Sequence, residues 1–181
     1  MLHDFSTSVT IVTKDSLFLC MNKIIPIFAA EIKREAMTTD ERYMRMALEE
    51  ARAAMAQEEI PVGAVVVANG QVIGRGHNLT ETLHDVTAHA EMQAITAAAE
   101  SLGGKYLTGC ALYVTVEPCV MCAGAIGWSQ LGRLVYGASD EKRGFRRFAP
   151  EALHPKTEVV SGVLEEECAQ LMKDFFKKKR N

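Results

Sequence analysis

The sequence predicts an α/β protein in which a mixed five-stranded sheet lies between two layers of helices. Two observations predict this class. Short apolar segments rich in β-branched residues alternate with longer segments whose apolar residues recur every three or four positions, as on one face of a helix. Their order is helix, strand, strand, helix, strand, helix, strand, connection, strand, helix, and this alternation is typical of a three-layer α/β/α fold.

The first helix is expected to begin at Thr38. Thr38-Thr39-Asp40-Glu41 is a capping box, in which a threonine is followed three residues later by a glutamate. Apolar residues then recur at helical spacing, namely Met44, Ala47, Leu48, Ala51, Ala54 and Met55. Residues 61–67 are too few and too β-branched for a helix and predict a buried strand. Asn69-Gly70 predicts a hairpin turn into a second strand, residues 71–74.

The remaining elements follow in turn. A helix over residues 88–102 is expected to stop at Gly103-Gly104, because glycine readily adopts the left-handed geometry that ends helices. Pro118 ends a third strand and precedes a helix of small residues. The expected ranges are a third strand at 111–116, a helix at 119–129, a fourth strand at 133–136, a polar and basic connection at 138–157, a fifth strand around 159–160 and a last helix at 165–179.

Composition narrows the class of protein. The chain has 181 residues, is 48% hydrophobic and carries a formal net charge of −3, which fits a globular domain and excludes a strongly basic nucleic-acid binder. No apolar run is long enough to span a membrane. The five cysteines are odd in number and include one Cys-x-x-Cys pair, which favours a reducing, cytoplasmic compartment over a secreted disulfide scaffold.

The first 37 residues differ from the rest. Their pattern is irregular, and the apolar stretch at residues 24–30 matches a signal peptide poorly because the preceding region is long and contains Asp4 and Asp15. We therefore expect residues 1–37 to be a poorly ordered N-terminal extension or the product of an upstream start, with Met37 as the functional first residue. Residues 38–181 are expected to form the single functional domain.

Three residues predict a metal centre. Cys119 and Cys122 stand three apart at the start of a predicted helix, so both sulfurs lie on one side of its first turn, and the helix N-terminus favours thiolates. His89 begins an earlier helix, and two helices leaving neighbouring strands can converge at one sheet edge. Two thiolates and an imidazole suit zinc and leave a fourth position open for catalysis. The alternatives are a redox pair of cysteines and a structural zinc site closed by Cys110 or His84.

The motifs His89-Ala90-Glu91 and Pro118-Cys119-Val120-Met121-Cys122 resemble the zinc-dependent cytidine and nucleobase deaminase superfamily. The match is closer to the bacterial tRNA-specific adenosine deaminases over residues 38–180. It also includes Ile60-Pro61-Val62-Gly63, Gly76-His77-Asn78, Thr115-Val116-Glu117 and Asp174-Phe175-Phe176. The resemblance implies a cytidine deaminase-like fold, a homodimer, one zinc ion per subunit and a tRNA anticodon stem-loop as partner.

The resemblance also implies a reaction. Zinc hydroxide would attack C6 of adenosine at the wobble position (34) and form inosine, with Glu91 as proton shuttle and His89, Cys119 and Cys122 as zinc ligands. Asn78 would bind the purine, offering its NH₂ to N7 and its oxygen to a donor. The implied substrate-binding residues are Asn78, Ala90, Asp140 and Phe176. One of Phe175 and Phe176 is expected to pack in the core and the other to lie near the RNA.

Two segments depart from the better-known members, namely residues 142–148 and the four consecutive cations at 177–180. In an otherwise acidic chain we expect these basic runs to contact RNA phosphates. Two alternative functions remain open. The protein could deaminate a free base or nucleoside, such as guanine or cytosine, or it could be a non-catalytic, zinc-folded RNA-binding subunit. The presence of Glu91 argues against the second, because the inactive partners in this superfamily typically lack the glutamate.

Overall fold

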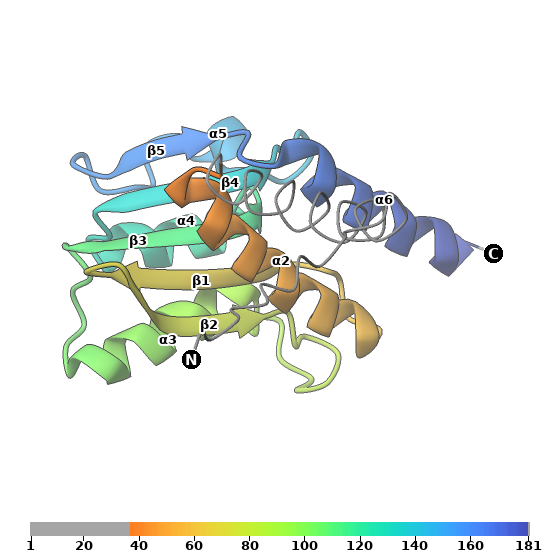
Figure 1. Ribbon diagram of the computed structural model, residues 1–181, viewed down its shortest axis with the longest axis horizontal. Helices are drawn as coiled ribbons and strands as arrows, with labels where there is room; N and C mark the ends of the chain where they lie inside the picture. Colours follow the sequence, from red (N-terminus) through yellow and green to blue (C-terminus); the bar gives the residue numbers. More distant parts are fainter. Residues whose placement is uncertain (1–36, 181) are drawn as a thin grey trace, which may run out of the picture. The chain divides into compact units, whose positions relative to one another are not determined.

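The computed structural model describes residues 37–180 (Figure 1). The expected N-terminal extension, residues 1–37, therefore lies outside the described residues except for Met37. Among residues 37–180, no helix combines the length and the apolar character needed to cross a lipid bilayer.

A mixed five-stranded sheet forms the centre of the described domain, as the sequence predicts (Figure 1). The strands are β1 (Gly63–Ala68), β2 (Gln71–His77), β3 (Cys110–Val116), β4 (Arg133–Ala138) and β5 (Glu158–Ser161), in the order β2-β1-β3-β4-β5. β1 pairs antiparallel with β2 and β3, whereas β3, β4 and β5 run parallel. Asn69 and Gly70 both adopt positive φ values, 50° and 76°, as the hairpin between β1 and β2 requires.

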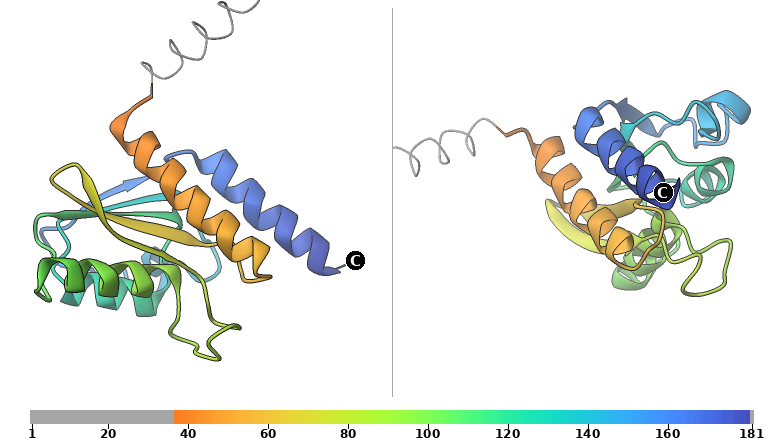
Figure 2. Two further views of the ribbon diagram at one scale, coloured as in Figure 1. Left: turned by 60° about the horizontal axis from the view of Figure 1, so that its bottom comes forward. Right: turned by 90° about the vertical axis from the view of Figure 1, so that its right-hand side faces the viewer.

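Helices cover both faces of the sheet (Figure 2). α2 (Thr39–Ala56) and α6 (Glu165–Arg180) lie on one face, and α3 (Ala90–Leu102) and α4 (Val120–Trp128) lie on the other. The three-layer α/β/α prediction is thus confirmed, and the predicted capping box at Thr38 and Glu41 is present. A short helix, α5 (Phe145–Phe148), lies inside the segment predicted to be a connection. One helical turn is too short to leave a periodic pattern in the sequence.

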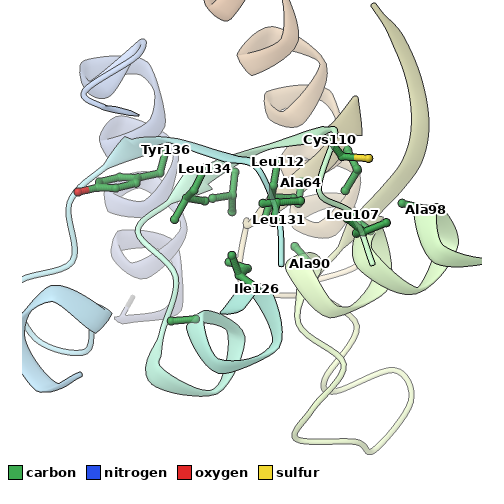
Figure 3. Close-up of a cluster of buried hydrophobic side chains, with 14 of the residues drawn as sticks. Ala64, Ala90, Ala98, Leu107, Cys110, Leu112, Ile126, Leu131, Leu134 and Tyr136 are labelled. Atoms are coloured by element: carbon green, nitrogen blue, oxygen red, sulfur yellow. The ribbon is translucent and has the colours of Figure 1, made fainter. Parts of the chain in front are cut away.

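The core beneath α3 and α4 contains aliphatic side chains from the sheet and small residues from the helices (Figure 3). α3 presents alanines to the sheet, and Gly74 and Gly76 of β2 face them. A Cβ on Gly74 would collide with the backbone of Ala94, and one on Gly76 with that of Ala90. Because only glycine permits this approach, the sequence brings the first turn of α3, where His89 and Glu91 lie, close to the sheet.

Asp40 joins the start of α2 to the sheet. Its carboxylate accepts two hydrogen bonds from the guanidinium of Arg133, at 2.7 and 2.9 Å, and one from the hydroxyl of Tyr113, at 2.9 Å. The hydrogen bond from Arg133 is the main reason that the pKa of Asp40 lies below its usual range. The folded state therefore stabilises the ionised carboxylate.

We expect Asp40→Asn to lower the free energy of unfolding near neutral pH by about 1–3 kcal/mol, because it removes a charge-assisted pair. The folded-state pKa is lowered, so this stabilisation is present above the ordinary pKa of about 3.9 and is lost as the pH falls through the folded-state value. In urea titrations at several pH values, the gap between wild type and variant should narrow below about pH 4. A gap independent of pH would contradict this role of the charge.

Candidate active site

The metal-ligating residues predicted from the sequence meet at one edge of the sheet. His89 is the N-cap of α3, Cys119 is the N-cap of α4, and Cys122 lies in the first turn of α4. The two helices follow β2 and β3. The prediction that these strands are neighbours is wrong, because β1 lies between them. Both strands are antiparallel to β1, so they run toward the same edge. The helices that follow them lie on the same face, and their N-termini converge there (Figure 2).

The geometry of these three side chains fits zinc. One ligand atom from each of His89, Cys119 and Cys122 lies within 4.8 Å of the others. Nδ1 of His89 is 3.7 Å from Sγ of Cys119 and 3.5 Å from Sγ of Cys122. Two sulfurs and one imidazole nitrogen at these separations are the donor set that Zn²⁺ prefers, and three protein ligands leave one coordination position for a further ligand.

The two cysteines differ in their protonation. A hydrogen bond from Cys122 is the main reason that the pKa of Cys119 falls to about 4. The same pairing, together with burial, raises the pKa of Cys122 far above its usual value. The hydrogen bond with Cys119 likewise raises the pKa of His89. The group thus already holds one thiolate, and a cation bound there would displace the remaining proton.

Glu91 lies beside this group in the first turn of α3. Its side chain is buried, with 3% of its surface exposed, and burial raises its pKa. Ala90, between His89 and Glu91, is fully buried. A buried carboxylate next to three candidate ligands is well placed to carry a proton.

No fourth protein ligand closes the site in the described part of the chain. Cys110 and His84, the two candidates from the sequence, do not belong to the cluster. Cys110 begins β3, whereas Cys119 comes after the end of that strand, so the length of β3 separates the two sulfurs. This arrangement favours an open, catalytic site over a closed structural one.

Asn78 follows β2 directly and is 5% exposed. Its backbone N–H donates to the carbonyl of Val62 at 3.0 Å. Its side-chain amide donates to Oε2 of Glu59 at 2.9 Å and to Oγ1 of Thr80 at 3.0 Å. The loop that leads from Asn78 to His89 therefore begins at a residue with a fixed side chain.

Asp140 lies on a second loop, which is attached to the cysteine motif through Glu117. The buried carboxylate of Glu117 accepts hydrogen bonds from the backbone N–H groups of Asp140 and Arg146, both at 3.1 Å. The carboxylate of Asp140 in turn accepts from the backbone N–H groups of Lys142 and Arg143, at 2.9 and 3.0 Å. Asp140 therefore holds a turn together, and Glu117 keeps that turn next to Cys119.

Only some of the basic side chains predicted to contact RNA are free of hydrogen bonds to other parts of the described domain. In the first run, the guanidinium of Arg146 binds Glu117 and that of Arg147 donates to the carbonyl of Glu141. The second run, residues 177–180, forms the exposed last turn of α6. Phe175 is buried, whereas Phe176 is 44% exposed, which matches the expectation that one of them packs. Phe176 belongs to α6, which lies on the opposite face of the sheet from α3 and α4.

Sequence reasoning missed two buried carboxylates, Glu59 and Glu117. Glu59 is fully buried, yet it follows Glu58, which is exposed, and no local pattern separates the two. Glu117 stands directly before the Pro118-Cys119 motif, but no local pattern indicates that it binds a loop more than 20 residues away. In both cases the partners are distant in sequence, so only the fold reveals them.

Comparison with known proteins identifies the family. The model of the MafB19-like deaminase family matches residues 38–180. The tRNA-specific adenosine deaminase of Bacillus subtilis (strain 168) is 47% identical over 149 residues, which cover 80% of this chain and 92% of that protein.

Solved structures agree. A structure from studies of A-to-I editing by tRNA:A34 deaminases at the wobble position of transfer RNA has a TM-score of 0.68 and 46% identity, covering 72% of this chain and 98% of that one. A guanine deaminase from Nitrosomonas europaea has a TM-score of 0.65 and 27% identity, covering 75% and 83% of the two chains. The fold is thus cytidine deaminase-like, as the resemblance implied. The chain belongs to the MafB19-like deaminases and to the family of tRNA-specific adenosine deaminases.

Proposed function

We propose that this protein hydrolyses adenosine to inosine at the wobble position (34) of a tRNA anticodon. The observation that carries the proposal is the convergence of His89, Cys119 and Cys122 beside a buried glutamate, Glu91, at the edge of the sheet. The identity of 46–47% to tRNA-specific adenosine deaminases supports adenosine in tRNA as the substrate.

His89, Cys119 and Cys122 would hold one zinc ion. A bound zinc ion supplies Lewis acidity, which lowers the pKa of water from about 15.7 to about 7. Glu91 takes a proton from the attacking water and delivers it to N1 of the adenine as C6 becomes tetrahedral. The remaining proton of the added hydroxyl then passes through Glu91 to the amino group, which leaves as ammonia. Burial keeps this carboxylate away from bulk water, so its proton goes to the substrate.

The target base has to leave its stack before C6 can be attacked, and single-stranded loops offer such bases. Lys142 and Arg143, on the loop next to Cys119, would contact the phosphates of the anticodon loop, and residues 177–180 of α6 would contact RNA further away. Asn78, Ala90, Asp140 and Phe176 would contact the nucleotide or its neighbours. We further propose a cytoplasmic location, since a reducing compartment keeps the two metal-binding thiols reduced.

The proposal is tested by comparing substrates for the full-length, zinc-loaded protein. We expect inosine formation on an anticodon stem-loop that has adenosine at position 34, and no ammonia release from free guanine, cytosine or adenosine. Ammonia release from a free base, with an unchanged stem-loop, would favour a free-base deaminase. RNA binding without any deamination would favour a non-catalytic subunit.

We also propose a homodimer that buries the exposed end of α4. Trp128 is 86% exposed there, and a groove of about 420 Å³ beside it includes Tyr106, Leu153 and His154. A large apolar side chain at this exposure is typical of a protein interface. A second copy is the occupant that the family resemblance implies.

Trp128 is the only tryptophan in the chain, so its fluorescence reports directly on this surface. We expect its emission to shift to longer wavelength on dilution, as the dimer dissociates and the indole becomes hydrated. Trp128→Glu should sediment as a monomer at concentrations at which wild type is a dimer. Glu49→Lys, a charge change on the exposed side of α2, across the sheet from α4, serves as control. A wild type that sediments as a monomer at all concentrations would contradict the dimer.

A further inference from the structure

Glu59 is a fully buried carboxylate with no part in the metal group. It lies between the end of α2 and the start of β1, and none of its surface is exposed. All hydrogen-bond donors to its carboxylate belong to the loop that follows β2. Oε1 accepts from the backbone N–H of Thr82 at 2.7 Å, and Oε2 accepts from the backbone N–H of Glu81 at 3.3 Å. Oε2 also accepts from the side chains of Asn78, at 2.9 Å, and Thr80, at 3.4 Å.

This carboxylate is ionised at neutral pH. Burial raises the pKa of Glu59, but the hydrogen bonds from Thr82, Glu81 and Thr80 lower it further than burial raises it. An ionised carboxylate has only acceptor oxygens, so each group that faces it has to donate. Four donors from one loop therefore bind a single buried negative charge, which fixes the start of that loop.

The same reasoning determines how the side chain of Asn78 is turned. Only the NH₂ end of its amide can face Glu59, because two acceptors would repel each other. Both hydrogens of that NH₂ have partners, namely Glu59 and Thr80. Within residues 37–180, no hydrogen bond is recorded for Oδ1 of Asn78. The oxygen is therefore the end of the amide that remains for a ligand.

We propose that Glu59 is a positioning residue, which turns Asn78 so that this residue offers the target nucleotide a hydrogen-bond acceptor and not a donor. This inference rests on the proposed function and on the expected place of Asn78 beside the substrate. The acceptor pairs with an N–H or O–H group of the nucleoside, namely the exocyclic amine of adenine or a ribose hydroxyl. Donation from Asn78 to N7, which the sequence allowed, is excluded while both amide hydrogens are held.

The first experiment compares Glu59→Gln with Glu58→Gln. Both substitutions remove one negative charge at adjacent positions, but Glu58 is exposed and its side chain makes no hydrogen bond within residues 37–180. We expect Glu59→Gln to raise KM for the stem-loop roughly 10- to 100-fold, with kcat changed much less, because a contact present both before and in the transition state is lost. Glu58→Gln should stay within about twofold of wild type, and both variants should keep one zinc ion per chain.

A second readout does not depend on activity. The glutamine NH₂ cannot accept from the backbone N–H of Glu81, so hydrogen exchange at Glu81 should become faster in Glu59→Gln and stay unchanged in Glu58→Gln. If the wild type fails to deaminate the stem-loop, the proposed function is wrong, and this exchange measurement still tests the role of Glu59. If the wild type is active and Glu59→Gln matches Glu58→Gln in both KM and exchange, the positioning role is wrong.

A swapped pair tests which end of the amide faces the substrate. Asn78→Asp alone places two carboxylates together and should lower both Tm and kcat/KM. In the double variant Glu59→Gln with Asn78→Asp, the glutamine NH₂ donates to the new carboxylate, which still offers an acceptor to the nucleotide. We expect recovery of Tm and of kcat/KM to within about tenfold of wild type. Recovery of Tm without recovery of kcat/KM would show that the substrate needs a donor at position 78, and would overturn the inference.

If the double variant does not recover Tm, a crystal structure of the inactive Glu91→Gln variant with an adenosine-containing anticodon stem-loop decides the orientation. The acceptor arrangement places a donor group of the nucleoside within hydrogen-bond distance of Oδ1 of Asn78 and keeps Nδ2 on Glu59. A purine N7 bound to Nδ2, with the contact to Glu59 broken, would overturn the inference.

Discussion

Cys119→Ala is expected to lose zinc, stability and turnover together. Cys119 contributes one of three candidate ligands, and it holds the thiolate of the pair, with a pKa of about 4. Its removal leaves two ligands, too few for a stable zinc site. Because zinc bound to the folded state stabilises that state, its loss should lower Tm by roughly 10 °C or more. Turnover on the stem-loop should fall below detection.

Metal analysis, calorimetry and the inosine assay check this result. Cys110→Ala is the control for the loss of a thiol, since Cys110 is buried and lies outside the metal group. This control should keep one zinc ion per chain and lose about 1 kcal/mol of stability through the small cavity. Full zinc content in Cys119→Ala would contradict the proposed ligand set.

Glu91→Ala is expected to abolish turnover without weakening the binding of zinc or of the stem-loop. The side chain is buried beside the metal group, whose three members would all be occupied as zinc ligands. General acid–base catalysis contributes roughly 10²–10⁴ in rate, so the single-turnover rate should fall at least that far. Zinc content and stem-loop affinity should stay near wild type, because Glu91 is neither a ligand nor a phosphate contact in the proposal.

The conservative variant Glu91→Gln sharpens this test. It preserves the size of the side chain but cannot carry the proton, so it should be as inactive as Glu91→Ala. Glu100→Gln changes an exposed glutamate near the other end of α3 and should retain full activity. Turnover near the wild-type rate in Glu91→Gln, with zinc bound, would rule out the proposed proton shuttle.

Local signals in the sequence predicted most elements correctly. The capping box at Thr38, the Asn69-Gly70 hairpin and the glycine stop at Gly103 each depend on residues a few positions apart, and each is present in the structure. The placement of the two candidate ligands Cys119 and Cys122 on one side of a helix start was also predictable, because it depends on their spacing alone.

Contacts between segments that are distant along the chain could not be predicted from the sequence. The hairpin shows that β1 contacts β2, but it does not show that the other edge of β1 pairs with β3, which is why the strands before α3 and α4 were wrongly expected to be neighbours. The roles of Glu59 and Glu117 depend on the same missing information. Their partners lie about 20 or more residues away, and burial of a carboxylate leaves no periodic pattern.

The measurement that tests the proposed chemistry most directly is isotope incorporation. The full-length, zinc-loaded protein would be incubated with an anticodon stem-loop in water enriched in ¹⁸O, and the nucleosides analysed by mass spectrometry. Hydrolysis by a site composed of His89, Cys119, Cys122 and Glu91 predicts inosine at the wobble position with one ¹⁸O atom, and no inosine with Glu91→Gln. Inosine without the label, or no inosine from wild type that contains stoichiometric zinc, would contradict this hydrolytic mechanism.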